Sequence, residues 1–378
     1  DYVTWVNAKK DDETMREFVK LALKYAGANN IVPDETIKNE SETTKNITTN
    51  PLKLGYYLVS SSAGSLISID TNNPNKNISE KNGVPTVTKM ISTDNGTTYS
   101  AKKNSVNAGD NVYYQTTITF KPGAKNYKLH DTMDNKLKFA GYIHDIHTNL
   151  GSTFDQTKYI NLVTSPTDGC TFDVVFTNGT LKPNDVVTVS YSATLNDKAV
   201  IAGAGNPNDT KLSYTDTNNK SHETVPSVTH TYTWQVDVYK YTMKDNKETP
   251  LAGAQFVLYK TVNNVKYYAV VDATSKITGW TMEGVKPKEN ADESKTYASV
   301  FTTPASGKFT ITGLDSDTYY LEEIVAPAGY NLLKDPITVT VKNDGTVSYG
   351  DSTGEVRVLN STGTELPSTG GIGTTIFY

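Results

Sequence analysis

Short stretches of alternating apolar and polar residues, separated by turn-forming residues, recur along most of this 378-residue chain. Turn sequences such as Asp94-Asn95-Gly96 and Asn178-Gly179 lie between the stretches. Alternation with a period of two places the apolar side chains on one face of a strand. The pattern therefore predicts an antiparallel β-sandwich over residues 84–228. Its expected strands are Thr86 to Ile91, Asn111 to Phe120, Tyr127 to Thr132, Thr171 to Thr177, Asp185 to Leu195 and Lys211 to Asp216.

Residues 229–365 predict a second sandwich, and no low-complexity linker separates it from the first. We therefore expect two stacked domains with a short junction. Residues 1–83 predict a small α+β domain, with apolar residues at helical spacing over 12–27 and strand-like sequence in 55–59 and 65–70. The strands expected in the second sandwich are Trp234 to Met243, Gln255 to Lys260, Lys308 to Thr312, Thr318 to Val325 and Ile337 to Val341.

The composition excludes several kinds of protein. Cys170 is the single cysteine, so an intrachain disulfide is impossible, and we interpret it as a partly buried, unreactive thiol. The net charge of −5 offers no electrostatic basis for binding nucleic acid. His144 and His147 lack a third ligand at a convincing spacing, and we interpret them as loop histidines. We therefore expect no metal and no cofactor.

One lysine in each predicted sandwich falls on the apolar face of its strand. In Val236-Asp237-Val238-Tyr239-Lys240, alternation places Lys240 on the side of the valines. In Val87-Thr88-Lys89-Met90-Ile91 it places Lys89 on the side of Val87 and Ile91. A charged lysine is costly in a core unless it is neutral or paired. Each lysine therefore requires a partner on the same buried side.

Inward-facing asparagines and acids occur in the same two segments. Asn360 ends the strand-like sequence 356–360, and Glu323 is a candidate acid in Leu321-Glu322-Glu323-Ile324-Val325. In the first sandwich the candidate acid is Asp131. Asn208 has the parity required of its partner, but Asn206 has the same parity and remains an alternative.

A lysine, an acid and an asparagine suffice for a spontaneous amide bond between side chains. Burial disfavours the ammonium, so the lysine becomes a nucleophile, while a protonated acid polarises the asparagine carbonyl and moves protons as ammonia leaves. Such a bond forms once, without turnover of an external substrate. The alternative is a buried salt bridge of Lys89 with Asp131, and of Lys240 with Glu323, without covalent chemistry.

A sorting motif follows the last predicted strand. Leu366-Pro367-Ser368-Thr369-Gly370 matches LPxTG, which sortase transpeptidases cleave between threonine and glycine. A sortase cysteine attacks the Thr369 carbonyl and passes the chain to an amine, so this peptide must be exposed and extended. We interpret residues 366–378 as the signal followed by a truncated hydrophobic anchor.

These features together resemble the Gram-positive sortase-assembled pilins, fimbrial subunits with intramolecular Lys–Asn isopeptide bonds. Residues 229–370 resemble a Cna B-type domain, and residues 84–228 resemble the fimbrial domain that precedes it. The resemblance implies tandem immunoglobulin-like sandwiches, with Glu323 rather than Glu322 as the acid. The resemblance to the Cna B-type domain is carried by Val238-Tyr239-Lys240, Pro250 to Phe256, Glu323 to Tyr330 and Asn360. The resemblance to the fimbrial domain is carried by Pro85 to Lys89, Ala108-Gly109-Asp110, Asp131-Thr132-Met133 and Gly205 to Asn208.

The resemblance also implies an acceptor lysine for polymerisation. Pilins usually carry it in a motif similar to Tyr-Pro-Lys-Asn near the junction of their first two domains. This chain departs from that motif, because residues 75–83 read Asn-Lys-Asn-Ile-Ser-Glu-Lys-Asn-Gly. We expect Lys81 to be the acceptor, with Lys76 as the second choice; the alternative is an ordinary solvated linker lysine.

The sequence is therefore compatible with two functions. The first is a structural pilus subunit on the bacterial cell surface, which a pilus-class sortase joins to neighbouring subunits and to cell-wall peptidoglycan. The alternative is a wall-anchored adhesin, or an ancillary or basal pilin, that binds a host surface ligand through its N-terminal domain. An enzyme acting on an external substrate is disfavoured, because the sequence shows no recognisable pair of nucleophile and base.

Overall fold

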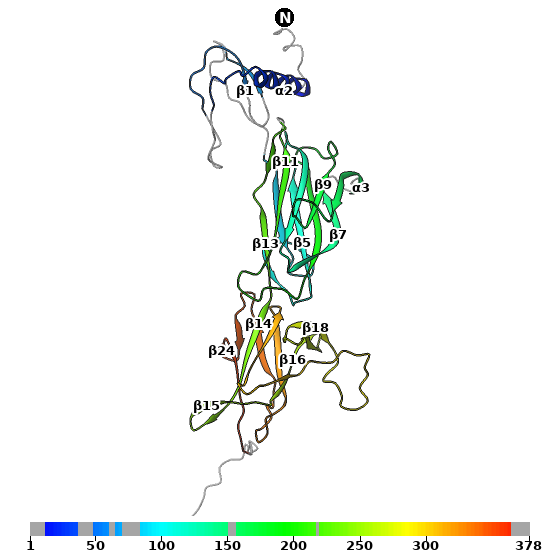
Figure 1. Ribbon diagram of the computed structural model, residues 1–378, viewed down its shortest axis with the longest axis vertical. Helices are drawn as coiled ribbons and strands as arrows, with labels where there is room; N and C mark the ends of the chain where they lie inside the picture. The colour runs from blue at the N-terminus through cyan, green and yellow to red at the C-terminus, as the bar shows by residue number, and fades with distance from the viewer. Residues whose placement is uncertain are drawn as a thin grey trace, which may run out of the picture.

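The computed structural model describes residues 12–36, 48–59, 65–69, 84–149, 156–216 and 219–363. The protein is mainly β, as the sequence predicts. Figure 1 shows its sheets following one another along the long axis of the molecule in the order of the sequence. Within the described residues, no helix has both the length and the apolar character needed to cross a membrane.

A helix and a hairpin make up the described N-terminal part. Helix α2 (Asp12–Ala28) covers the predicted helical segment and continues one residue beyond Gly27. Strands β1 (Gly55–Val59) and β2 (Ser65–Ile69) pair antiparallel, and both lie against α2. Val19 of the helix is buried, which is consistent with the apolar face that the sequence predicts for it.

Two sheets enclose the first large hydrophobic core, which includes Ile91, Tyr114, Leu129 and Tyr191. One sheet has the strand order β3-β5-β10-β7; the other has the order β4-β13-β11-β6-β9-β8, with β12 beside β11. The elements of this sandwich are β3 (Thr86–Ile91), β4 (Lys103–Ser105), β5 (Asn111–Thr119), β6 (Lys125–Met133), β7 (Leu137–Thr148), α3 (Gln156–Tyr159), β8 (Ile160–Val163), β9 (Phe172–Phe176), β10 (Val186–Leu195), β11 (Asn206–Thr215), β12 (Ser221–Glu223) and β13 (Ser227–Tyr232).

Strand β7 corrects one interpretation made from the sequence. His144 and His147 lie in this strand and are not loop histidines. Because β7 is an edge strand that pairs with β10 alone and exposes most of its side chains, its apolar alternation is weak. Strand β11 also differs from expectation, since it begins at Asn206 rather than Lys211 and so contains both candidate asparagines.

A second core, centred on residues such as Val236, Phe256, Ile311 and Leu321, lies between the sheets of the C-terminal sandwich. One sheet has the order β15-β14-β20, with β25 beside β14; the other has the order β18-β17-β16-β21-β22-β23-β24, with β19 beside β16. The strands are β14 (Trp234–Lys244), β15 (Lys247–Pro250), β16 (Gln255–Val262), β17 (Val265–Val271), β18 (Ile277–Thr281), β19 (Phe301–Thr302), β20 (Lys308–Leu314), β21 (Thr318–Val325), β22 (Ile337–Val341), β23 (Val347–Tyr349), β24 (Ser352–Thr353) and β25 (Val356–Leu359).

The first and last strands of the C-terminal sandwich lie side by side. Strands β14 and β25 pair in parallel, with Lys240 opposite Val358. The amide of Asn360 donates a hydrogen bond to Tyr241 O at 3.0 Å. Parallel neighbours require a long crossover, and here the intervening strands of the sandwich form it. The end of β25 is thereby placed next to Lys240.

The junction between the two sandwiches is short and polar. Thr233 alone separates β13 from β14. The amide of Ala108 donates to Gly313 O at 2.9 Å, and the amide of Asp315 donates to Asn107 Oδ1 at 3.1 Å. Burial raises the pKa of Asp315 to about 6. These hydrogen bonds connect the two sandwiches near the point where the chain passes from one to the other.

Gly307 positions the strand that carries Lys240. Its φ is +68°, a Cβ there would overlap Lys240 O, and its own oxygen accepts the Lys240 amide hydrogen at 2.8 Å. We expect Gly307→Ala to lower the free energy of unfolding by about 2 kcal/mol, through both strain and overlap. Urea unfolding would measure this. The matched control is Gly354→Ala, where φ is +94° but no atom lies within 4 Å of the added Cβ; equal losses in both variants would contradict the role of Gly307.

Candidate functional site

Lys240, Glu323 and Asn360 meet in the core of the C-terminal sandwich. Lys240 belongs to β14, Asn360 follows β25 in the same sheet, and Glu323 comes from β21 in the opposite sheet. Each residue is at most 4% exposed. The sequence therefore predicts correctly that all three side chains point inward.

One carboxyl group contacts both nitrogens of this cluster. Lys240 Nζ donates to Asn360 Oδ1 and lies 3.1 Å from Glu323 Oε1. Asn360 Nδ2 donates to Glu323 Oε1 and Oε2 at 3.1 and 3.2 Å. The Leu333 amide donates to Glu323 Oε2 at 3.0 Å and holds the carboxyl in place. Glu323 is therefore positioned to take a proton from the amine and to give one to the amide nitrogen.

The surroundings of Lys240 favour the neutral amine. Burial lowers the pKa of Lys240, although the nearby Glu323 carboxylate opposes this shift. An uncharged amine has the lone pair that a nucleophile needs. The cluster thus combines a nucleophile, an electrophilic amide carbon and a proton carrier within contact distance.

Lys89 is buried in the other sandwich in a comparable way. It comes from β3, is 0% exposed, and its Nζ donates to Asp131 Oδ2 at 2.6 Å and to Thr210 Oγ1 at 2.9 Å. The Tyr191 hydroxyl also donates to Asp131. Burial lowers the pKa of Lys89 from 10.5 to about 8, and Asp131 opposes the shift. A substantial fraction of this amine is therefore neutral near pH 8.

Hydrogen bonding distinguishes the two candidate asparagines. The Asn206 side chain accepts from the Val200 amide at 2.9 Å and donates to Thr231 O at 3.0 Å. Asn208 is equally buried, yet its side-chain amide makes no well-formed hydrogen bond and has only a weaker interaction with the Tyr114 hydroxyl. A buried amide without a well-formed hydrogen bond is costly. Because Asn208 lies two residues before Thr210 on the same face of β11, it is the better candidate for reaction with Lys89, even though Nζ bonds Thr210 instead.

Two other sets of predicted residues lie outside the described part of the chain. They are the acceptor candidates Lys81 and Lys76 and the sorting motif Leu366 to Gly370. Asn360 lies only a few residues before the motif, so β25 ends close to the expected cleavage site.

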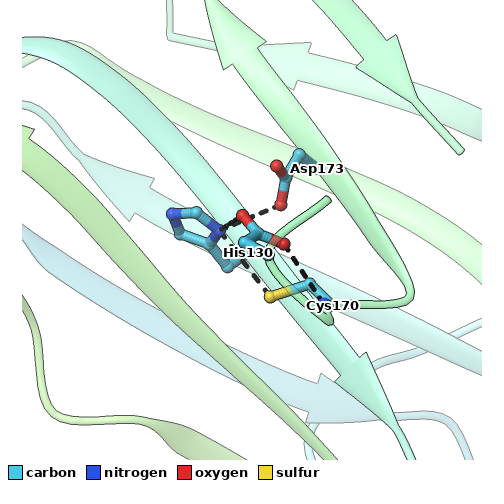
Figure 2. A group of neighbouring side chains, drawn as sticks. His130, Cys170 and Asp173 are labelled. Atoms are coloured by element: carbon cyan, nitrogen blue, oxygen red, sulfur yellow. Dashed lines mark hydrogen bonds and ion pairs between the residues drawn. The ribbon is translucent and has the colours of Figure 1, made fainter. Parts of the chain in front are cut away.

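The structure also brings together a cluster that the sequence reasoning missed. His130 Nδ1 lies 3.2 Å from Asp168 Oδ2, 2.9 Å from Asp173 Oδ1 and 3.8 Å from Cys170 Sγ (Figure 2). The sequence shows no recognisable pair of nucleophile and base, but the folded protein places His130 beside Cys170. The spacing Asp168-x-Cys170-x-x-Asp173 was a usable signal, but the strand pairing that adds His130 is not visible in the sequence.

Comparison with protein families gives one match within the chain. Residues 236–353 match the family described as the SpaA prealbumin-like fold domain. This segment contains Lys240 and Glu323 and ends just before β25.

Comparison with whole proteins extends the similarity to both sandwiches. A curated relative, the trypsin-resistant surface T6 protein of Streptococcus pyogenes serotype M6, is 25% identical over an alignment that covers 79% of this chain. The alignment spans 66% of the length of that relative. The resemblance to Gram-positive pilins found in the sequence is confirmed.

Solved structures share the fold. A 35 kDa C-terminal fragment of the major pilin GBS80 of Streptococcus agalactiae matches with a TM-score of 0.52 and 16% identity, covering 74% of this chain and 100% of the fragment. BcpA, the major pilin subunit of Bacillus cereus, matches with a TM-score of 0.51 and 18% identity, covering 82% of both chains. The fold of this chain is therefore similar to that of these two major pilins.

The shifted pKa of Lys89 predicts a pH dependence of stability when the amine is free. In Asn208→Ala, the folded state loses the Lys89 proton above pH 8, whereas the unfolded chain keeps it up to about 10.5. The unfolded state binds more protons in this window, so the free energy of unfolding should rise with pH, by about 3 kcal/mol in all. Urea unfolding between pH 7 and 10.5 measures the rise.

The control removes both ionisable partners. In Asn208→Ala/Lys89→Met/Asp131→Asn, neither Lys89 nor Asp131 can ionise. The difference between its curve of unfolding free energy against pH and that of Asn208→Ala is therefore the contribution of Lys89 and Asp131. Parallel curves for the two proteins would contradict a depressed pKa for Lys89.

Proposed function

We propose that this protein is a structural subunit of a Gram-positive pilus, and that each of its two sandwiches carries a self-formed Lys–Asn isopeptide bond. The observation that carries the proposal is the buried contact of Lys240 with Asn360 under a shared Glu323 carboxyl. The similarity to major pilins supports the same reading at the level of the whole chain.

The bond in the C-terminal sandwich forms by attack of neutral Lys240 Nζ on Asn360 Cγ. Glu323 removes a proton from Nζ and delivers one to Nδ2, so ammonia leaves and a secondary amide remains. Asp131 has the corresponding role for Lys89 and Asn208. Each sandwich reacts once with itself after folding, so the protein is modified by its own side chains and does not turn over an external substrate.

The position of the bonds explains their mechanical value. Only Thr233 separates β13 from β14, and Lys240 lies within β14. Asn360 is the residue at which the chain leaves the last strand. Tension that enters through β14 passes across the Lys240–Asn360 amide to the C-terminal segment, so the strands between them carry no load. By analogy with disulfides closing loops of similar length, each bond contributes about 4 to 5 kcal/mol.

Assembly by sortase completes the proposal. A pilus-class sortase cleaves after Thr369 and joins it to a lysine of the next subunit, Lys81 in preference to Lys76; the last subunit is joined to peptidoglycan. This places the protein outside the cell, on the cell wall. The acceptor lies before the first sandwich and the donor follows the last one, so successive subunits link head to tail.

Intact-protein mass tests the internal bonds. The wild-type protein should weigh less than its sequence by two ammonia molecules, whereas Asn360→Ala and Asn208→Ala should each lose only one. Asn206→Ala is the matched control and should keep both bonds, because the amide of Asn206 is already engaged by Val200 and Thr231. A wild-type mass equal to that of the unmodified sequence would refute the covalent proposal.

Incubation with a pilus-class sortase tests the assembly separately. The wild-type protein should give a ladder of covalent multimers on a denaturing gel, and Lys81→Arg should abolish it while Lys76→Arg does not. The opposite result would transfer the acceptor role to Lys76. A ladder that survives the double variant would exclude both lysines, and a single wall-linked product without multimers would favour the adhesin over the shaft subunit.

A further inference from the structure

The cluster around His130 lies on the outer face of the first sandwich, away from the isopeptide chemistry. His130 belongs to β6 and Asp173 to β9, and the two residues are directly opposite each other in the pairing of these strands. Asp168 and Cys170 come from the turn that leads into β9. Figure 2 shows the side chains of His130, Cys170 and Asp173 turned toward one another. Among the described residues, this group brings a nitrogen, a sulfur and carboxylate oxygens to one point.

We propose that His130, Asp168, Cys170 and Asp173 bind one Zn²⁺ ion. Their four ligand atoms lie within 4.8 Å of one another. From His130 Nδ1 the distances to the other three are 2.9, 3.2 and 3.8 Å, the longest being that to sulfur. Tetrahedral zinc with bonds of about 2.0–2.3 Å separates its ligands by about 3.3–3.8 Å. The site is therefore close to the required size before any ion enters.

The hydrogen bonds of the cluster leave two of its ligand atoms available, His130 Nδ1 and Asp173 Oδ1. His130 Nε2 lies 2.8 Å from Ser213 Oγ; when Nε2 carries the proton and donates it there, Nδ1 presents a lone pair to the cluster. Asp173 is 2% exposed, and its Oδ1 accepts no hydrogen bond even though Nδ1 is 2.9 Å away. In that tautomer, His130 Nδ1 and Asp173 Oδ1 are two buried acceptors that face each other, and a cation between them would stabilise both.

The charges of the neighbourhood also fit a divalent ion. Lys128 Nζ pairs with Asp173 Oδ2 at 2.9 Å and with Asp168 Oδ2 at 3.0 Å. With both carboxylates ionised and the thiol protonated, the group carries one excess negative charge. Zinc binding releases the Cys170 proton to solvent, after which three negative ligands, Zn²⁺ and the lysine ammonium sum to zero. The side chain of Asp168 is 34% exposed, which provides a route for the ion.

A catalytic thiol is a poorer explanation of the same residues. A nucleophilic cysteine needs a histidine that takes its proton on one ring nitrogen while the other is held by an acid. Here the sulfur and both acids face the same nitrogen, Nδ1. Burial also raises the pKa of Cys170, the reverse of an activated thiol. The mixed nitrogen, sulfur and oxygen donors instead favour zinc over calcium or magnesium.

The site has a structural consequence for the neighbouring acid. The Thr171 amide donates to Asp131 O at 2.8 Å, and Thr171 Oγ1 accepts from the Met133 amide at 2.9 Å. A bound ion would fix the turn 168–171 against β6, and with it the backbone that carries Asp131 toward Lys89 on the opposite face. Zinc would thus act as a clamp between β6 and the approach to β9.

Metal titration of the full-length, tag-free, reduced protein tests the proposal. After treatment with a chelator, the protein should take up one equivalent of Zn²⁺ in competition with a chromophoric chelator. Co²⁺ should give the visible bands of a tetrahedral site together with a thiolate-to-cobalt absorption in the near ultraviolet. Cys170→Ser should abolish that absorption, and Asp173→Asn should weaken Zn²⁺ binding by at least about tenfold.

His147→Gln is the matched control, because His147 forms an exposed pair with Asp145 outside the cluster; its affinity for zinc should equal that of the wild type. The wild-type cobalt spectrum does not depend on the folding of any variant. Absence of stoichiometric binding at micromolar Zn²⁺, or a thiolate band that persists in Cys170→Ser, would overturn the proposal and leave an ion-pair cluster centred on Lys128.

Discussion

The structure depends on two lysine amines buried between β-sheets, each held by a carboxyl group from the opposite sheet. A buried ammonium is expensive, and each amine is therefore met by Asp131 or Glu323 at hydrogen-bond distance. This requirement favours the observed registers of β3 and β14 within their sheets, because a shift of one residue would turn the lysine to the opposite face. The same burial lowers the pKa of both amines, a shift that the proposed reaction with asparagine requires.

The two sites differ in how completely they are assembled. Around Lys240, the Asn360 amide contacts both the amine and the Glu323 carboxyl group. Around Lys89, the Thr210 hydroxyl lies next to the amine, and the side-chain amide of Asn208 makes no well-formed hydrogen bond. The contacts around Lys89 are thus less complete than those around Lys240.

The order of the strands turns these local contacts into a mechanical element. Strand β14 follows β13 almost immediately, and β25 returns beside β14 in parallel. The strands through which the chain enters and leaves the C-terminal sandwich are therefore neighbours in one sheet. The proposed crosslink between Lys240 and Asn360 would shield the strands between them from tension. The zinc clamp proposed at His130 would act differently, because it joins β6 to the segment before β9 on an outer face and leaves the path of load unchanged.

The sequence by itself determined which side chains are buried, because strand alternation is a local property that parity reveals. Lys89, Lys240, Glu323 and Asn360 were all placed correctly in this way, as was the mainly β fold. Parity could not choose between Asn206 and Asn208, which share a face; only their hydrogen bonds in the folded protein separate them. Nor could it reveal β7, whose edge position weakens its pattern, or the approach of His130 to Asp173, which arises from strand pairing across residues far apart in the chain. Those features depend on tertiary contacts, and only the tertiary structure decided them.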